Sequence, residues 1–537
     1  MKIIYITIFV LLTAMVSLAY LYFSKLNSDT NDNEISLYAA TAKSGLIFSF
    51  QSDKSVLDLL GSQDLLQSLV PGETLQSLAS LQREILAIPQ INQQTRNQNI
   101  YLSFLPGENK NLDFLISTQI KEKQDPALIL NIFKARGIKT EQLADFVKIT
   151  LKDSSSFYFG QKNRLLLLSG SFKVVAEGLQ APEQKNNQDF IEYIKSNHKL
   201  SKNSLAVLYL NFNYLGGLEQ LATPEKFKGR NAFANYSYSF SKDRILFNGN
   251  TTINDENNYL NLFSTTKAGK ISIDAILPES TANYTIYIMD NYAAWSKGLA
   301  GWFAANKKIE QVGKTINRIK SRYNLDLNNT FPQYFKNQLI TFQLKSTETF
   351  GAINLTNGDK LSQLLLDVSS EYNQEIMLLK EPGLLYAYFG EPFEKFNKPY
   401  YVIIDNYMVF STYPSSLQVF LNSYKNDRQL INNKDYTDAR NQLVAESNIV
   451  YYLNHKNSEK IATGNLYLPY FKLYNAEDKL GRFNNLIYQL SSDQKKFQTN
   501  LLISKTPEVV VDSLQASRGT LQGPHDALQS SNDSLPD

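Results

Sequence analysis

The hydrophobic positions in the first half of the chain follow two spacings, one typical of strands and one typical of helices. Gly45–Phe50 and Leu205–Asn211 are short apolar runs, and each predicts a strand. In Val56–Leu69 and Glu73–Ile88 the apolar residues recur at helical spacing, which predicts two amphipathic helices separated by a turn. Both kinds of element therefore occur in the same part of the chain.

Several of the expected strands follow one another directly, without a helix between them. Ile100–Leu105 and Leu112–Thr118 flank a Pro-Gly-Glu-Asn turn and predict a hairpin. The other expected strands are Lys148–Leu151, Ser156–Phe159, Arg164–Ser169, Ala232–Ser241 and Ile245–Ile253, and the other expected helices are Pro126–Ala135, Phe172–Leu179 and Asp189–Ser196. Strands outside βαβ alternation favour an α+β fold, with mainly antiparallel sheets and helices packed on one face.

The chain also repeats itself. Ser204–Asn211 and Ser447–Asn454 are identical at five of eight positions, at an offset of 243 residues. Weaker matches at nearby offsets pair Leu46–Phe50 with Thr285–Met289, Phe157-Tyr158 with Tyr400-Tyr401, Asn163 with Asn406, and Phe233, Phe247 and Asn250 with Phe483, Phe497 and Asn500. Matches spread over whole halves predict two homologous tandem lobes, residues 35–270 and 271–504, because the period is far longer than that of solenoid repeats.

The second lobe is rich in aromatic residues. Tyr284–Tyr287 and Tyr386–Phe389 are expected strands, and Tyr292–Arg322 is expected to form helices that carry Trp295 and Trp302. The helical region has a basic run: Lys307, Lys308, Lys314, Arg318, Lys320 and Arg322. This run is either a solvated helix face or a surface that docks on anionic lipid or on a partner.

Ile3–Phe23 is a run of 21 uncharged, mostly apolar residues between Lys2 and Lys25. At 1.5 Å per residue, about 20 residues span a ~30 Å hydrocarbon core, which predicts an N-terminal transmembrane helix. Cleavage as a signal peptide is the alternative, since Ser17-Leu18-Ala19 resembles a cleavage site. We expect an anchor (1–25), a linker (26–34), the two lobes, and a polar, disordered tail (505–537).

Composition removes several classes of function. The 537 residues are 43% hydrophobic and 20% charged, which suits globular lobes. The net charge of +3 gives no reason to expect a nucleic-acid partner. The chain has no cysteine, which excludes disulfides, thiol catalysis, Cys-ligated metals and lipoprotein acylation.

Candidate chemistry is sparse. His198, His455 and His525 have no metal-ligand spacing and are expected at the surface. Ser264–Lys267 and Ser492–Lys495 match Ser-x-x-Lys but lack the companion motifs of penicillin-binding enzymes, and no phosphate-binding or dinucleotide-binding loop is present. We therefore predict no catalytic, cofactor-binding or metal residue and no cofactor, and we expect that the protein is not an enzyme. A hydrolase that uses carboxylates alone is the least favoured alternative.

The chain contains 32 tyrosines and 31 phenylalanines. Strand packing explains most of them, because a tyrosine can bury its ring and keep its hydroxyl in water. The alternative is a groove between the lobes, lined by aromatic side chains, that binds an apolar, peptide or glycan ligand.

The N-terminal span, the matched strands 204–211 and 447–454, and the Leu277-Pro278 step before the second lobe resemble a family of uncharacterised bacterial envelope proteins with a signal anchor and a long duplicated α+β domain of unknown function. The resemblance covers most of residues 35–504 and implies no site residues. We expect a single-pass protein of the inner membrane, held through residues 3–23, whose bulk is periplasmic. Its expected function is a non-enzymatic interaction or assembly platform for an envelope protein partner, and the alternative is a ligand-binding module.

Overall fold

The computed structural model describes residues 34–51, 72–95, 98–106, 112–120, 126–143, 145–197, 206–214, 231–241, 243–465, 474–476 and 480–505. These residues form an α+β fold around a 20-stranded sheet, accompanied by helices and by a two-stranded sheet of β11 (Gly269–Lys270) and β19 (Glu446–Ser447). Every described strand pair is antiparallel, as for β1 with β2 and β12 with β13. The expected α+β class with an antiparallel sheet is confirmed.

The first half of the sheet contains ten strands. In spatial order they are β4 (Lys139–Gln142), β5 (Phe146–Thr150), β6 (Ser156–Lys162), β7 (Leu165–Ser169), β3 (Leu112–Gln119), β2 (Asn99–Pro106), β1 (Leu46–Gln51), β8 (Ala206–Asn211), β9 (Ala232–Ser241) and β10 (Arg244–Ile253). The strands expected from the sequence are all present here, with ends shifted by a few residues.

The second half also contains ten strands. In spatial order they are β15 (Ser369–Glu371), β16 (Met377–Leu379), β17 (Tyr400–Ile404), β18 (Tyr407–Ser411), β14 (Thr349–Leu355), β13 (Phe335–Leu344), β12 (Thr281–Ile288), β20 (Ile449–Asn454), β21 (Asn485–Asp493) and β22 (Lys496–Ser504). The expected strand Tyr284–Tyr287 lies within β12.

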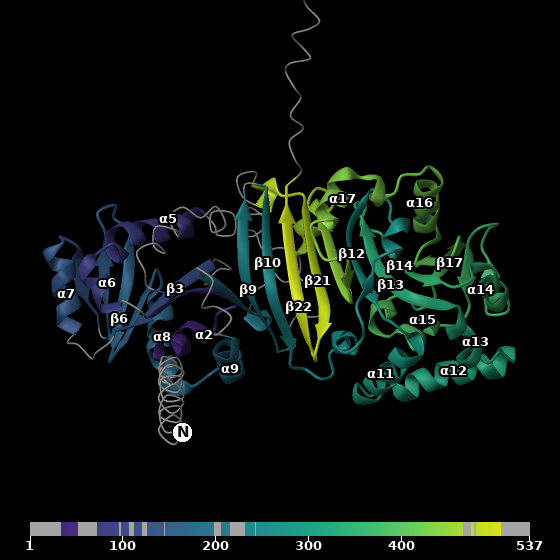
Figure 1. The fold of residues 1–537 in the computed structure, drawn as a ribbon, viewed down its shortest axis with the longest axis horizontal. Coiled ribbons are helices and arrows are strands. Elements are labelled where there is room, and N and C mark those ends of the chain that lie inside the picture. Colours follow the sequence, from purple (N-terminus) through teal and green to yellow (C-terminus); the bar gives the residue numbers. More distant parts are fainter. Residues whose placement is uncertain are drawn as a thin grey trace, which may run out of the picture. The chain divides into compact units, whose positions relative to one another are not determined.

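The two halves meet along one strand pair. β10 lies beside β22 in Figure 1, and the pairing runs from Arg244 with Ser504 to Thr251 with Phe497. The sheet therefore continues across the expected boundary between residues 270 and 271. The described residues, which end at Lys505, form one compact unit.

The expectation that helices cover only one face of the sheet is wrong. β7 explains why, because Leu166 and Leu168 pack with α7 on one face, while Leu165 and Leu167 pack with α8 on the other. A strand with an unbroken apolar run has both faces buried. In the first half the helices are α2 (Ile35–Thr41), α5 (Gly72–Leu81), a π-helical turn η1 (Gln82–Leu86), α6 (Pro89–Thr95), α7 (Pro126–Ala135), α8 (Phe172–Gln184) and α9 (Gln188–Asn197).

In the second half the longer helices are α11 (Tyr292–Ala305), α12 (Ile309–Tyr323), α14 (Gly358–Leu365), α16 (Pro414–Lys425), α17 (Lys434–Arg440) and α18 (Glu459–Asn465). The shorter turns of the two halves together are η4 (Phe212–Tyr214), η6 (Tyr259–Phe263), η7 (Ile273–Ile276), α13 (Leu327–Thr330), η8 (Phe331–Tyr334), α15 (Leu384–Phe389), η9 (Glu391–Phe393), η10 (Leu430–Asn432) and η11 (Leu480–Arg482). The helices expected over Pro126–Ala135, Phe172–Leu179, Asp189–Ser196 and Tyr292–Arg322 are confirmed.

One expected strand is instead a helix. Tyr386–Phe389 belongs to α15, all six residues of which are buried. The helix is bounded by Gly383 and Gly390, whose positive φ angles of 75° and 71° turn the chain sharply at both ends. A short aromatic run bounded by turns is compatible with a buried strand or a buried helix, and periodicity cannot separate the two.

Several predictions fall outside the described residues. They are the membrane span Ile3–Phe23, nearly all of the linker 26–34 and the tail 505–537, the helix Val56–Leu69, and the histidines His198 and His525. Within the described ranges, no helix is long and apolar enough to cross a membrane.

Candidate functional site

Helix α12 has one face in the core and one in solvent. Val312, Thr315 and Ile319 are buried, and the helix packs against α11, α13 and α15 of the second half. Lys314, Arg318 and Arg322 follow one another at a spacing of four residues and are exposed. Residues four apart lie on the same side of a helix, so these three cations form one line.

Two of these cations bind the same buried carboxylate. Arg318 donates from Nε to Oε2 of Glu381 at 2.9 Å, and Arg322 donates from a terminal nitrogen to Oε1 at 2.9 Å. The Tyr323 hydroxyl donates to Oε1 at 2.9 Å, and Arg318 also donates to the Pro382 carbonyl. Glu381 is 2% exposed, whereas Arg318 and Arg322 are 44% and 66% exposed. One carboxylate therefore holds two guanidinium groups whose outer edges stay in water.

The charges of this cluster reinforce one another. Burial opposes ionisation of Glu381, but the hydrogen bonds from Tyr323 and Arg318 and the charges of both arginines outweigh it and lower the pKa of Glu381. Burial and the neighbouring carboxylate raise the pKa of Tyr323, so its hydroxyl keeps its proton. At neutral pH the cluster is a carboxylate with two cations.

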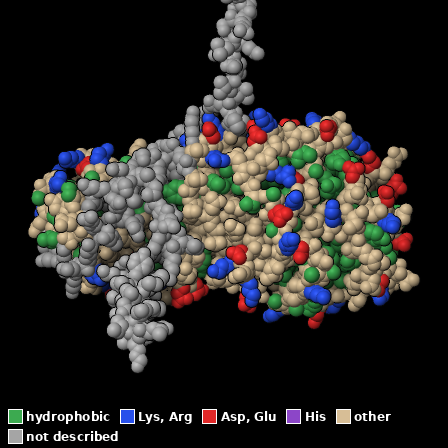
Figure 2. Space-filling model, in the orientation of Figure 1, with side chains coloured by type: hydrophobic (Ala, Val, Ile, Leu, Met, Phe, Trp, Pro, Cys, Tyr) green, Lys and Arg blue, Asp and Glu red, His purple; other side chains and the backbone are tan. Residues whose placement is uncertain are grey.

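A third cation lies on the same cluster. The Lys380 ammonium group lies 5.4 Å from the centre of the Tyr323 ring, and the Arg322 guanidinium lies 5.5 Å from it, within the range of cation–π attraction. We call Lys314, Arg318, Arg322 and Lys380 the α12 basic surface. On the face drawn in Figure 2, acidic and basic side chains are interspersed.

A second buried carboxylate also has an arginine partner. Asp274 is 1% exposed, pairs with Arg440 at 3.2 Å and accepts a hydrogen bond from Tyr436. Burial raises the pKa of Asp274, and Arg440 opposes that shift. In the described part of the chain the buried carboxylates are Asp274 and Glu381, and each is neutralised by arginine rather than paired with another acid. A hydrolase that uses carboxylates alone would need two acids that face each other, and these two buried carboxylates do not form such a pair. That alternative stays a prediction.

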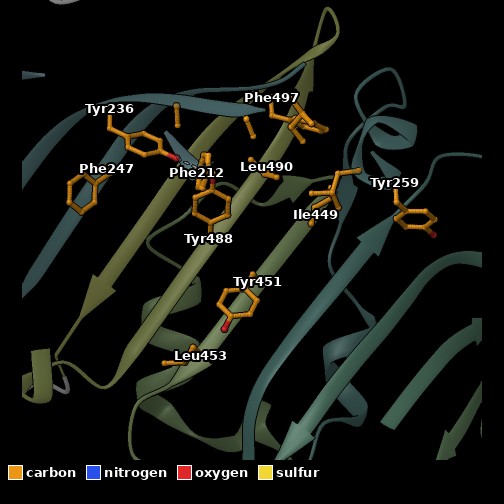
Figure 3. Packing of buried hydrophobic residues seen from close by; sticks show 14 of the residues in the cluster. Phe212, Tyr236, Phe247, Tyr259, Ile449, Tyr451, Leu453, Tyr488, Leu490 and Phe497 are labelled. Carbon is orange, nitrogen blue, oxygen red and sulfur yellow. Dashed lines mark hydrogen bonds between the residues drawn. The ribbon is translucent and has the colours of Figure 1, made fainter. Parts of the chain in front are cut away.

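The junction between the halves is filled by a hydrogen-bonded group. The hydroxyls of Tyr236 (β9) and Tyr488 (β21) lie 3.0 Å apart, and Thr251 lies 3.1 Å from Tyr488 and 2.8 Å from Thr499. All four residues are buried. Figure 3 shows Tyr236 and Tyr488 among the packed rings and aliphatic side chains of this region. The aromatic groove between the lobes stays a prediction.

The structure places the sequence candidates apart from one another. His455 is half-buried rather than at the surface: its ring stacks on Tyr474, and its Nε2 lies 2.7 Å from the Tyr474 carbonyl. Ser264 donates to the Asn261 carbonyl, and Ser492 donates to the Thr266 carbonyl at the start of the expected β21–β22 turn. Both serine hydroxyls therefore donate to backbone carbonyls rather than to the lysines of their motifs. Within the described ranges, no group of His, Asp and Glu has metal-site geometry.

The sequence indicates the basic run but not Glu381. Glu381 lies about sixty residues after Arg318 in the chain, in a loop whose only sequence signal is Glu-Pro-Gly. No spacing rule joins residues so far apart, and only the folded chain brings them together. No protein-family model, curated protein or solved structure matches this chain.

Proposed function

We propose that the protein is a non-enzymatic, membrane-anchored platform that binds an acidic face of a protein partner through the α12 basic surface. The observation that carries this proposal is the shared use of Glu381 by Arg318 and Arg322. A guanidinium has five donors, and those not used on Glu381 face solvent in a fixed orientation. Fixed arginines lose little entropy when they bind a carboxylate from a partner.

An acidic protein fits this surface better than a lipid membrane. Helices that lie on membranes bury an apolar face between the headgroups, beside their basic residues. The apolar face of α12 is already used in the core, through Val312 and Ile319. Apart from Ile309 at the start of the helix, the exposed residues of α12 are polar or charged, which suits a polar, charge-complementary interface.

We further propose that the body consists of two homologous lobes. The order of the ten strands is the same in both halves when β1–β10 are matched with β12–β18 and β20–β22. A duplication predicts this repetition of every pairing, including β1 between β2 and β8, and β12 between β13 and β20.

Details of register support the same duplication. In the β6–β7 turn Asn163 has a φ of 54°, and in the β17–β18 turn Asp405 has a φ of 50°. Both hairpins end on a serine that donates to the neighbouring strand, Ser169 to Phe114 and Ser411 to Thr349. The turns match Asn163 with Asp405, one residue from the pair that the sequence suggests.

The cross-strand partners also relate the halves across their junction. Leu208 pairs with Tyr236, and Tyr451 pairs with Tyr488, so the two tyrosines occupy equivalent positions. Asn248 and Asn500 then become equivalent, and they pair with each other in the β10–β22 ladder. This arrangement supports a two-fold relation between the lobes that passes through the Asn248–Asn500 pair.

Membrane attachment through residues 3–23, with an extracytoplasmic body in the bacterial envelope, completes the proposal and rests on the sequence. Its test is protease treatment of spheroplasts. The body is expected to be digested in intact spheroplasts and to remain membrane-bound in carbonate-washed vesicles. Protection of the body in intact spheroplasts would contradict the proposed orientation.

The partner site is tested by photo-crosslinking in native membranes. A photoreactive residue at Asn317, which is exposed on α12, is expected to capture a protein, and the same residue at Lys360 on α14 serves as the matched control. The double variant Arg318→Gln/Arg322→Gln should abolish capture, while Lys360→Gln/Lys434→Gln, which removes the same charge elsewhere, should not. Capture of lipid alone, or of the same protein from both positions, would contradict the proposal.

A further inference from the structure

The first half of the sheet contains an apolar pocket. It lies between strands β2, β3, β6 and β7 on one side and η1, α6 and α7 on the other, and its volume is about 50 Å³. Its walls are isoleucine and leucine side chains, together with Phe133, Phe159 and two threonines. An apolar space of this kind stays dry and accepts apolar groups.

The two threonines do not make the pocket polar. Thr95 donates to the carbonyl of Ile91 in its own helix, and Thr118 donates to the carbonyl of Asn99 on the neighbouring strand. Both hydroxyl donors are therefore used within the protein. A ligand in this space would meet methyl and methylene groups, and recognition would come from shape and desolvation.

The same place in the second half is filled. Ile116 pairs with Leu168 in the β3–β7 ladder, and the equivalent pair in the β14–β18 ladder is Gly351 with Phe410. The Phe410 ring lies over Gly351, so closely that a Cβ at residue 351 would be 2.3 Å from it. Phe393 and Phe396 contact the outer side of the ring, with centroids at 4.8 and 5.0 Å.

Phe393 and Phe396 come from a long connection between two strands of the second half. β16 ends at Leu379 and β17 begins at Tyr400, and α15 and η9 lie between them. In the first half the equivalent connection, from Thr150 at the end of β5 to Ser156 at the start of β6, is a short turn. The first half therefore lacks the segment that closes the equivalent face of the second half.

We infer that this pocket binds the end of a linear alkyl chain, as found in a fatty acid or in the acyl group of a lipid. The pocket is small, and most of its walls are branched aliphatic groups, which suits a flexible chain better than a rigid ring system. Each methylene that enters the pocket contributes about 0.8 kcal/mol, or about fourfold in affinity. This site is separate from the α12 basic surface, and the inference does not depend on the proposed partner.

The test uses full-length protein in native membranes and a dodecanoic acid that carries a diazirine at its terminal carbon. After illumination, labelled peptides are mapped by mass spectrometry. We expect labelling within the segments that hold Ile129 and Leu168, beyond any labelling of Ile3–Phe23, which serves as an internal measure of lipid exposure. A phospholipid that carries the same photoreactive chain separates the two sources: labelling by both probes means that the pocket accepts a lipid tail, and labelling by the acid alone means that it takes free acid.

Competition with unlabelled acids measures the selectivity. From octanoate to dodecanoate we expect protection to improve by about fourfold per methylene until the pocket is full. Adamantane carboxylate, which has the same headgroup on a bulky cage, should not compete. Equal protection by the cage compound would overturn the assignment to a linear chain.

Two variants and a control locate the site. Leu168→Phe places in the first half the residue found at Phe410 and should reduce labelling at least about tenfold, which corresponds to about 1.4 kcal/mol. Ile129→Ala should shift the best competitor to a longer chain, so the inference can still fail if Leu168→Phe does not fold. Leu128→Ala, on the same helix but exposed, should change neither the amount of labelling nor the chain length of the best competitor. Labelling confined to Ile3–Phe23, or unchanged in Leu168→Phe, would overturn the inference.

Discussion

The two halves of the sheet have the same strand order but cover one face with different chemistry. In the second half this face holds aromatic rings, among them Phe389, Phe393 and Phe410, and α15 closes it. In the first half the equivalent face combines isoleucine and leucine with aromatic rings such as Phe133 and Phe159, and a pocket remains beneath α7. The comparison indicates that the same strand order can support a closed face in one half and an apolar pocket in the other.

The connections between strands differ in the same way. In the second half, Glu381 follows β16 and binds Arg318 and Arg322 on α12 from a buried position. In the first half, Asp153 follows β5 and accepts a hydrogen bond from Ser80 on α5, but it is largely exposed. Hydrogen bonds from Ser155 and Ser80 lower the pKa of Asp153 to about 2. Both connections fasten a helix through a carboxylate, and only the second does so away from water.

The largest effect on stability is expected when Gly351 in the second half is replaced by isoleucine, the residue at the equivalent position 116 in the first half. Gly351→Ile places a side chain where Phe410 already lies and should destabilise the protein by about 3 kcal/mol or more, because a packed core cannot absorb the added volume. Urea unfolding followed by tryptophan fluorescence reports this directly, since Trp295 and Trp302 both lie in α11. Ile116→Val in the first half, the control, should cost about 1 kcal/mol. An unchanged unfolding midpoint in Gly351→Ile would mean that the Phe410 contact is not a close one.

The next effect concerns Glu381. Glu381→Gln should lower stability by about 2 kcal/mol at neutral pH, because it removes charged hydrogen bonds from a buried group. The pKa of Glu381 is lowered in the folded protein, so its stabilisation is present above the ordinary carboxyl pKa and is lost as the pH falls through the folded value. The difference in the free energy of unfolding between wild type and variant should therefore be largest near pH 7 and should disappear below about pH 4. Asp153→Asn, the exposed counterpart, should give a smaller difference, and a gap for Glu381→Gln that does not depend on pH would contradict this account.

A smaller effect is expected at the junction. Tyr236→Phe and Tyr488→Phe each remove one member of the hydroxyl pair and should each cost about 1 kcal/mol. The double variant should cost less than the sum of the two, because both single changes break the same hydrogen bond. Urea midpoints of the four proteins give this coupling. Strict additivity would show that the two hydroxyls do not interact.

The smallest effect is expected for Leu168→Phe. Filling the pocket should change the free energy of unfolding by less than about 1 kcal/mol in either direction, since space is available for the larger ring. Hydrogen exchange of the β3–β7 amides measures the local stability. A loss as large as that of Gly351→Ile would mean that the first half is packed as tightly as the second.

The sequence predicts most strands of the first half and the paired helices α11 and α12, because their periodicity is strong and local. The expectation that helices cover one face overlooks Leu165–Leu168, an unbroken apolar run that is typical of a strand buried on both faces. α15 is misassigned as a strand because its aromatic run is short and gives no usable periodicity. Short apolar runs record burial and not backbone conformation.

The candidate site is predicted only in part. The basic run is visible as a sequence pattern, and its helical spacing places Lys314, Arg318 and Arg322 on one line. Glu381 cannot be found in this way, because it comes from a loop distant in sequence and nothing local distinguishes this buried acid from the acids at the surface. The pocket is likewise invisible in the sequence, since it depends on the missing insertion between β5 and β6 as much as on the residues that line it.

The comparison between the halves is tested most directly by xenon. Xenon occupies dry apolar cavities without requiring polar contacts, and crystals of the protein under xenon pressure would locate such cavities. The account predicts a xenon atom between β3, β7 and α7 in the first half and none between β14, β18 and η9 in the second. Xenon at both places, or at neither, would contradict the claim that the second half closes the face that the first half leaves open.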